Sequence, residues 1–181
     1  MGKILKSLLV SVFIFSIVNV TSASSATYEN TKFNPNQGAL KYIESIEKTL
    51  EKNYGSLKRF EDVGGLYFDE MGVAHIGLKN RTLKSTELTN HIIEIVGDSY
   101  IKLEEVNYSI TELDNLKESI LNDIVSFLSY EDFKRSTFTI NALFKTQNLV
   151  LTFNYEGLPE DLVNQLKIKY QDILLVEEVN F

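Results

Sequence analysis

The sequence predicts an α+β fold in which two repeated β-β-α-β half-domains are joined by a helix and preceded by an N-terminal helix. Segments with the alternating pattern of strands interleave with segments of helical periodicity. Two of the strand pairs flank short polar turns. A short sequence also recurs, since residues 104–108 (EEVNY) and 177–181 (EEVNF) agree at every position except the final aromatic residue. A repeat of two such units favours two similar bodies packed side by side.

The first residues have the layout of a bacterial-type export signal. Lys3 and Lys6 precede an apolar run at residues 8–18, and small and polar residues follow it. This three-part pattern predicts a secretory signal peptide that is cleaved between Ala26 and Thr27. A retained membrane anchor is the alternative, but it would need roughly 20 apolar residues, and serines interrupt this run. We expect a secreted or cell-envelope-associated protein without stable membrane insertion after cleavage.

The composition limits the chemistry of the protein. The chain has no cysteine and a formal net charge of −7. Without cysteine there can be no disulfide framework, thiol catalysis or thiolate metal site, so stability must come from packing. An acidic surface repels nucleic-acid phosphates, which makes a nucleic-acid partner unfavourable. No cofactor is expected.

The first part of the chain is read as a lead-in followed by a helix and a hairpin. Residues 27–36 are polar and predict a flexible lead-in to a domain at 37–181. Apolar residues then recur at spacings of three and four as far as Leu57, which predicts a helix that Gly55 ends or interrupts. A hairpin follows, and Gly72 supplies the positive φ that its turn needs. The predicted elements are strands 66–68 and 73–76, helix 86–96 and strand 101–108.

The second part opens with a strong helix signal. Ser109 and Glu112 have the spacing of a capping box, which predicts the start of the linking helix. Further on, Pro159 is expected in the first turn of another helix. The remaining predicted elements are strands 138–144 and 149–153, helix 162–170 and strand 173–181. The two half-domains would therefore cover residues 64–108 and 137–181, and sequence duplication would explain their common order.

Two motifs resemble the prosegments of secreted bacterial chymotrypsin-fold serine proteases of the alpha-lytic protease and streptogrisin type. Residues 64–72 (GGLYFDEMG) are similar to the hairpin of those prosegments, and residues 106–113 (VNYSITEL) are similar to their junction between a strand and the linking helix. The resemblance implies an α+β prodomain made of two small sheets. It also implies a domain that docks on a protease as chaperone and inhibitor, and that lays its C-terminal tail along the active-site cleft.

The C-terminal strand is the candidate partner-binding site. Val179, Asn180 and Phe181 could add to an exposed sheet edge of a partner and place an aromatic ring in a pocket. The alternative is that this sequence is only a common strand ending in this protein. Residues 104–108 have nearly the same sequence as residues 177–181, and they lead into a helix. Because no protease follows Phe181 in this sequence, the expected action is in trans.

No catalytic group can be assembled from the sequence. His75 and His91 lack a third ligand at a suitable spacing, so no metal site is expected. The glutamates of the two repeated strand ends could form a carboxylate pair for glycoside chemistry, but solvated glutamates are the simpler interpretation. We therefore expect a non-enzymatic protein that binds a secreted serine protease as inhibitor or folding aid. The alternative is a cell-envelope interaction module unrelated to proteolysis.

Overall fold

The fold class is α+β, as predicted. The computed structural model describes residues 38–80, 83–154 and 157–179. The predicted signal peptide with its cleavage site at Ala26 and Thr27, the lead-in at 27–36, and the tail residues Asn180 and Phe181 lie outside the described residues. Within the described part, no helix is both long and apolar enough to cross a bilayer.

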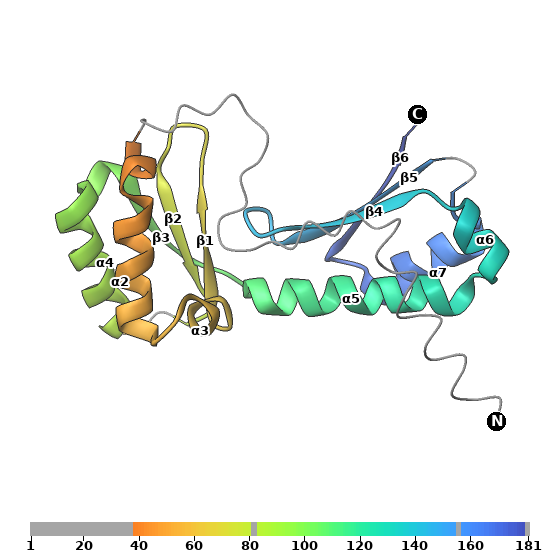
Figure 1. Cartoon of the computed structure of the whole chain (residues 1–181), viewed down its shortest axis with the longest axis horizontal. Helices are drawn as coiled ribbons and strands as arrows, with labels where there is room; N and C mark the ends of the chain where they lie inside the picture. Colours follow the sequence, from red (N-terminus) through yellow and green to blue (C-terminus); the bar gives the residue numbers. More distant parts are fainter. Residues whose placement is uncertain (1–37, 81–82, 155–156, 180–181) are drawn as a thin grey trace.

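The chain forms two three-stranded sheets with helices before and within each of them (Figure 1). The first sheet and its helices comprise α2 (Ile43–Tyr54), α3 (Leu57–Glu61), β1 (Gly64–Phe68), β2 (Ala74–Leu78), α4 (Leu83–Val96) and β3 (Ile101–Glu105). The second sheet and its helices comprise α5 (Ile110–Phe127), α6 (Tyr130–Arg135), β4 (Phe138–Leu143), β5 (Asn148–Asn154), α7 (Glu160–Tyr170) and β6 (Leu174–Val179). Short 3-10 turns at Gly38–Tyr42 and Asp98–Tyr100 complete the described elements.

Both sheets have the same strand order and the same pairing. β1 and β2 form an antiparallel hairpin, and β2 pairs in parallel with β3 after the crossover through α4. In the second sheet β4 and β5 form the hairpin, and β5 pairs in parallel with β6 after α7. The predicted β-β-α-β order therefore occurs twice along the chain. That this order arose by duplication of a sequence stays a prediction.

One face of the first sheet carries the helices α2 and α4 (Figure 1). Alternate strand residues point to this face, as the period of a pleated strand requires. Ile46, Leu50, Ile76 and Ile92 meet there and are fully buried. Burying four such side chains contributes on the order of 2 kcal/mol each, so this layer has a core of its own.

The long helix α5 leads from the first sheet to the second and runs along the second sheet (Figure 1). Its start has the predicted capping box: the Glu112 N–H donates to Ser109 Oγ (3.2 Å), and the Ser109 N–H donates to Glu112 Oε2 (2.9 Å). Ile120 and Ile124 of α5 pack with Leu151 of β5 and Leu166 of α7 in the second core. The helices α5 and α7 thus cover one face of this sheet.

Several predicted boundaries were wrong. Gly55 adopts a left-handed conformation (φ 88°) and ends α2, as predicted. The next apolar residue, Leu57, begins a separate short helix, α3, which was not predicted as an element of its own. The short helix α6 was not predicted, although Ser129 caps it. Pro159 occupies the N-cap of α7 rather than its first turn. β3 and β6 are both shorter than predicted.

The two sheets meet where a phenylalanine fills a space lined by glycines. Phe144, directly after β4, packs edge-on against Tyr67 of β1 with ring centroids 6.3 Å apart. A Cβ atom on Gly65 would lie 2.7 Å from the Phe144 ring, and one on Gly77 would lie 2.9 Å from it. The Gln147 side chain strengthens this joint, because its Oε1 accepts the Tyr108 N–H (2.7 Å). The hairpin of the second sheet is therefore anchored on the first sheet.

Candidate functional site

The predicted partner-binding strand forms an edge of the second sheet. β6 pairs only with β5 among the described strands, so its other side has no strand neighbour there. The Leu149 N–H donates to the Ile173 carbonyl (2.8 Å), which fixes the residues that face β5. Since N–H and C=O groups alternate in direction along a strand, those of Val176 and Glu178 point away from β5. Val179 is the one predicted tail residue that the structure describes, and it ends β6, half-buried.

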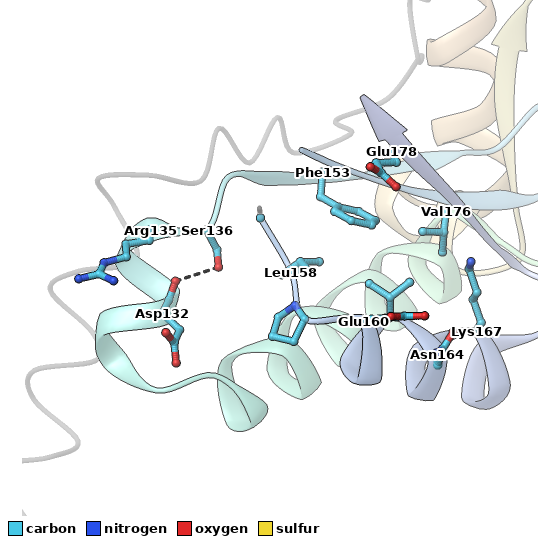
Figure 2. Close-up of a pocket in the computed structure, with 13 residues that line it drawn as sticks. Asp132, Arg135, Ser136, Phe153, Leu158, Glu160, Asn164, Lys167, Val176 and Glu178 are labelled. Carbon is cyan, nitrogen blue, oxygen red and sulfur yellow. Dashed lines mark hydrogen bonds between the residues drawn. The ribbon is translucent and has the colours of Figure 1, made fainter. Parts of the chain in front are cut away.

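A groove lies beside this edge, between the second sheet and α7. Its volume is about 890 Å³. Figure 2 shows β6 above it, α7 below it, and α6 with the start of β4 at one end. Phe153, Leu158 and Val163 form its apolar floor and are nearly buried within the protein. Val176 of β6 also lines the groove, so the floor continues to the edge strand.

The rim of the groove is charged and mostly acidic. The exposed side chains of Asp132, Glu160 and Glu178 carry negative charge, whereas Arg135 and Lys167 carry positive charge. In Figure 2, Glu178 comes from the strand and Glu160 from the first turn of α7, on opposite sides of the groove. This arrangement of an apolar floor and an acidic rim suits an apolar side chain next to a basic one. Sequence reading missed the groove because its lining comes from five separate segments.

A second polar group lies in the first sheet and was also missed. The buried ring of His75 on β2 contacts two carboxylates: its Nδ1 lies 2.6 Å from Glu104 Oε1, and its Nε2 lies 3.1 Å from Asp69 Oδ2. Tyr67 stacks on the imidazole with ring centroids 4.5 Å apart, and its hydroxyl donates to Glu104 Oε2 (2.9 Å). We refer to Tyr67, Asp69, His75 and Glu104 as the histidine cluster.

The two carboxylates of the histidine cluster have lowered pKa values in the folded protein. Burial raises the pKa of Asp69, but hydrogen bonds from the Val73 N–H and from His75 outweigh it and hold this pKa below its ordinary value. Burial likewise raises the pKa of Glu104, and the hydrogen bonds from His75 and Tyr67 outweigh it and lower the pKa. Burial, with the Glu104 hydrogen bond and charge, raises the pKa of Tyr67.

This geometry gives the histidine cluster a structural role. Asp69 also accepts hydrogen bonds from the backbone N–H groups of Met71 and Val73 (2.9 Å each), which close the turn between β1 and β2. His75 therefore links this turn to Glu104 on β3. The imidazole is only 5% exposed, and each of its nitrogens contacts a carboxylate, so the ring is enclosed within the protein. No cluster of three or more potential metal ligands occurs in the described parts of the chain.

The other candidates from the sequence lie apart from one another. His91 lies on α4, where its Nδ1 is 3.4 Å from Glu94 on the exposed side of the same helix. Glu104 belongs to the first sheet, whereas its sequence counterpart Glu177 belongs to the second and is exposed. Glu104 lies beside His75 of β2. The position on β5 that corresponds to His75 is occupied by Val150. The matching strand ends thus have different surroundings, and the four glutamates do not form one carboxylate site.

Comparison with known proteins yields no matching family model, no similar curated protein and no similar solved structure. The resemblance to protease prosegments rests on the two sequence motifs alone and stays a prediction.

Proposed function

We propose that this protein is a secreted, non-catalytic domain that binds an extracellular serine protease in trans, as inhibitor or folding aid, through the edge strand β6 and the residues after it. The observation that carries the proposal is the outer side of β6. Its outward backbone groups have no strand neighbour in the described chain, and Leu175 on the same strand is 47% exposed. An edge of this kind accepts an added strand from a partner.

The architecture supports this use of the edge. The second core holds β6 through its parallel pairing with β5, and Leu174 at its start is nearly buried. A strand fixed in this way presents its outward groups with little loss of conformational entropy on binding. The two small sheets and the motifs at residues 64–72 and 106–113 are what the resemblance to prosegments leads us to expect. The net charge of −7 favours a basic partner surface.

The first test measures protease inhibition and refolding. The mature chain (residues 27–181) is mixed with the secreted serine proteases of the producing cell, and residual activity and the yield of refolded protease are recorded. We expect inhibition or improved refolding, and a reduced effect when residues 179–181 are removed. If neither quantity changes with the full mature chain, the proposal is wrong. Binding to isolated cell envelopes without any effect on a protease would support the alternative accessory role.

The second test separates strand addition from side-chain contacts. Glu178→Pro removes one outward N–H without removing a donor to β5, whereas Glu178→Ala removes the side chain and keeps the N–H. We expect Glu178→Pro to weaken protease binding strongly and Glu178→Ala to weaken it less. Far-UV circular dichroism and thermal unfolding verify that both variants fold. Equal binding by the wild type and the folded Glu178→Pro variant would contradict strand addition at β6.

A further inference from the structure

The side of β6 that lies over α7 determines what an added strand would touch. Val176 and Glu178 are two residues apart and line the groove together. Leu174, also on this face, is part of the second core. A strand paired with β6 would lie about 4.8 Å away. Its alternate side chains would face the groove beside Val176 and Glu178, at the typical cross-strand separation of about 5 Å.

The two positions along β6 differ in chemistry. Next to Val176 the strand is apolar, because Val176 packs against the second core and its partner on β5 is the fully buried Leu151. Next to Glu178 it is acidic, because the strand carboxylate lies across from Glu160 at the start of α7 (Figure 2). The first position suits a branched aliphatic side chain, which would bury its own surface and the remaining surface of Val176. The second position suits a basic side chain that pairs with the Glu178 carboxylate across the strands.

We infer that the groove is a specificity pocket for a partner strand that carries an aliphatic side chain opposite Val176 and a lysine or arginine opposite Glu178. This inference rests on the proposed strand addition and names the partner's chemistry: an exposed strand with an aliphatic residue and a basic residue two positions apart. The three carboxylates of the rim, against two cations, favour the basic residue. The excess of negative charge over the whole chain acts in the same direction.

The test uses the mature chain and three synthetic peptides as probes. The peptides are Thr-Thr-Val-Thr-Lys-Thr-Thr, the same sequence with Glu in place of Lys, and the same sequence with Thr in place of Lys. Binding is followed by chemical-shift titration of the ¹⁵N-labelled protein, which detects weak complexes. We expect the Lys peptide to bind about two- to fivefold more tightly than the Thr peptide, as a cross-strand pair of opposite charges provides. The Glu peptide should bind more weakly than either.

Charge reversal provides the matched control. Glu178→Lys should reverse the order of the three peptides. Glu177→Lys makes the same change of charge at the next residue, whose side chain points to the other face of the sheet, and it should leave the order unchanged. The preference should also fall as the salt concentration rises.

The outcomes separate the two proposals. If no peptide binds the wild type, the proposal of strand addition is wrong, and the proposal of a specificity pocket is wrong as well. If the peptides bind without preference, or if Glu177→Lys alters their order as strongly as Glu178→Lys, the pocket is wrong while strand addition stands. Binding of every peptide should be lost in Glu178→Pro, because that variant removes the outward N–H that the added strand would use.

Discussion

The ring of Phe144 occupies the space above Gly65 that any side chain there would need. A Cβ on Gly65 would lie 2.7 Å from two atoms of that ring and 2.7 Å from Ile110 Cδ1. Phe144 belongs to the second core, whereas Gly65 belongs to β1 of the first sheet. The absence of a side chain at one position thus lets the two sheets pack against each other.

Gly65→Ala should destabilise the protein by about 1–3 kcal/mol, because the added methyl group overpacks the joint. Urea unfolding of residues 27–181 measures this change in the free energy of unfolding. The φ of Gly65 is not positive, so the effect should come from space rather than from backbone strain.

A double variant isolates the contact. Phe144→Leu makes room above Gly65, so the cost of Gly65→Ala should be smaller in the Phe144→Leu background than in the wild type. If the two changes in the free energy of unfolding are additive, Phe144 is not the residue that restricts the size of the side chain at position 65.

The stability of the protein should fall in acid because of the histidine cluster. The pKa values of Asp69 and Glu104 lie below their ordinary values of 3.8 and 4.5 in the folded state. A group whose pKa is lowered by folding contributes stability above its unfolded pKa. This stability is lost as the pH falls through the folded value. Glu104→Gln should therefore make the free energy of unfolding less dependent on pH below about 4.5.

Glu105→Gln is the control for this prediction. Glu105 is the neighbouring residue on β3, it is exposed, and its side chain points to the opposite face. Urea midpoints measured from about pH 3 to pH 7 should separate the two variants. A pH dependence that Glu104→Gln leaves unaltered would show that the cluster does not contribute to it.

Gly38→Ala should be more destabilising than Gly55→Ala. Both residues have positive φ values, 59° and 88°, so each alanine would strain the backbone by about 1 kcal/mol. At Gly38 the new Cβ would also lie 2.6 Å from the Gly72 carbonyl oxygen, where the turn between β1 and β2 leaves no room. At Gly55 the nearest atom is the end of the flexible Arg59 side chain, at 3.2 Å. Thermal unfolding of the two variants should rank them in this order, and the reverse ranking would contradict the close approach at Gly38.

Ser109→Ala should destabilise the protein by about 1 kcal/mol, because it removes the side-chain acceptor of the capping box at the start of α5. Ser109 is fully buried, so water cannot replace the lost hydrogen bond easily. The matched control is Ser56→Ala at the N-cap of the short helix α3, whose hydrogen bond to the Arg59 N–H is exposed. The change at Ser56 should be the smaller of the two in chemical unfolding. Equal effects would mean that burial of the α5 cap adds nothing.

Local signals explain the parts of the fold that could be predicted. Gly72 in the first turn and the Ser109–Glu112 pair determine the structure of only a few neighbouring residues. The hairpin and the start of α5 could therefore be predicted without knowledge of tertiary contacts. The short helices α3 and α6 were missed because a helix of five or six residues has too few turns to show an apolar period. Their cap serines, Ser56 and Ser129, were local signals for them.

By itself, the sequence determined the α+β class, the order of the strands along the chain and the position of the β6 segment at its end, because these follow from periodicity and turn chemistry. Only the tertiary structure decided that His75 lies between Asp69 and Glu104, since the parallel pairing of β2 with β3 sets which residues meet. It also decided that β6 lies at an edge and that Val176 and Glu178 share a groove with α7. Contacts of this kind depend on how distant segments pack, and no local pattern encodes them.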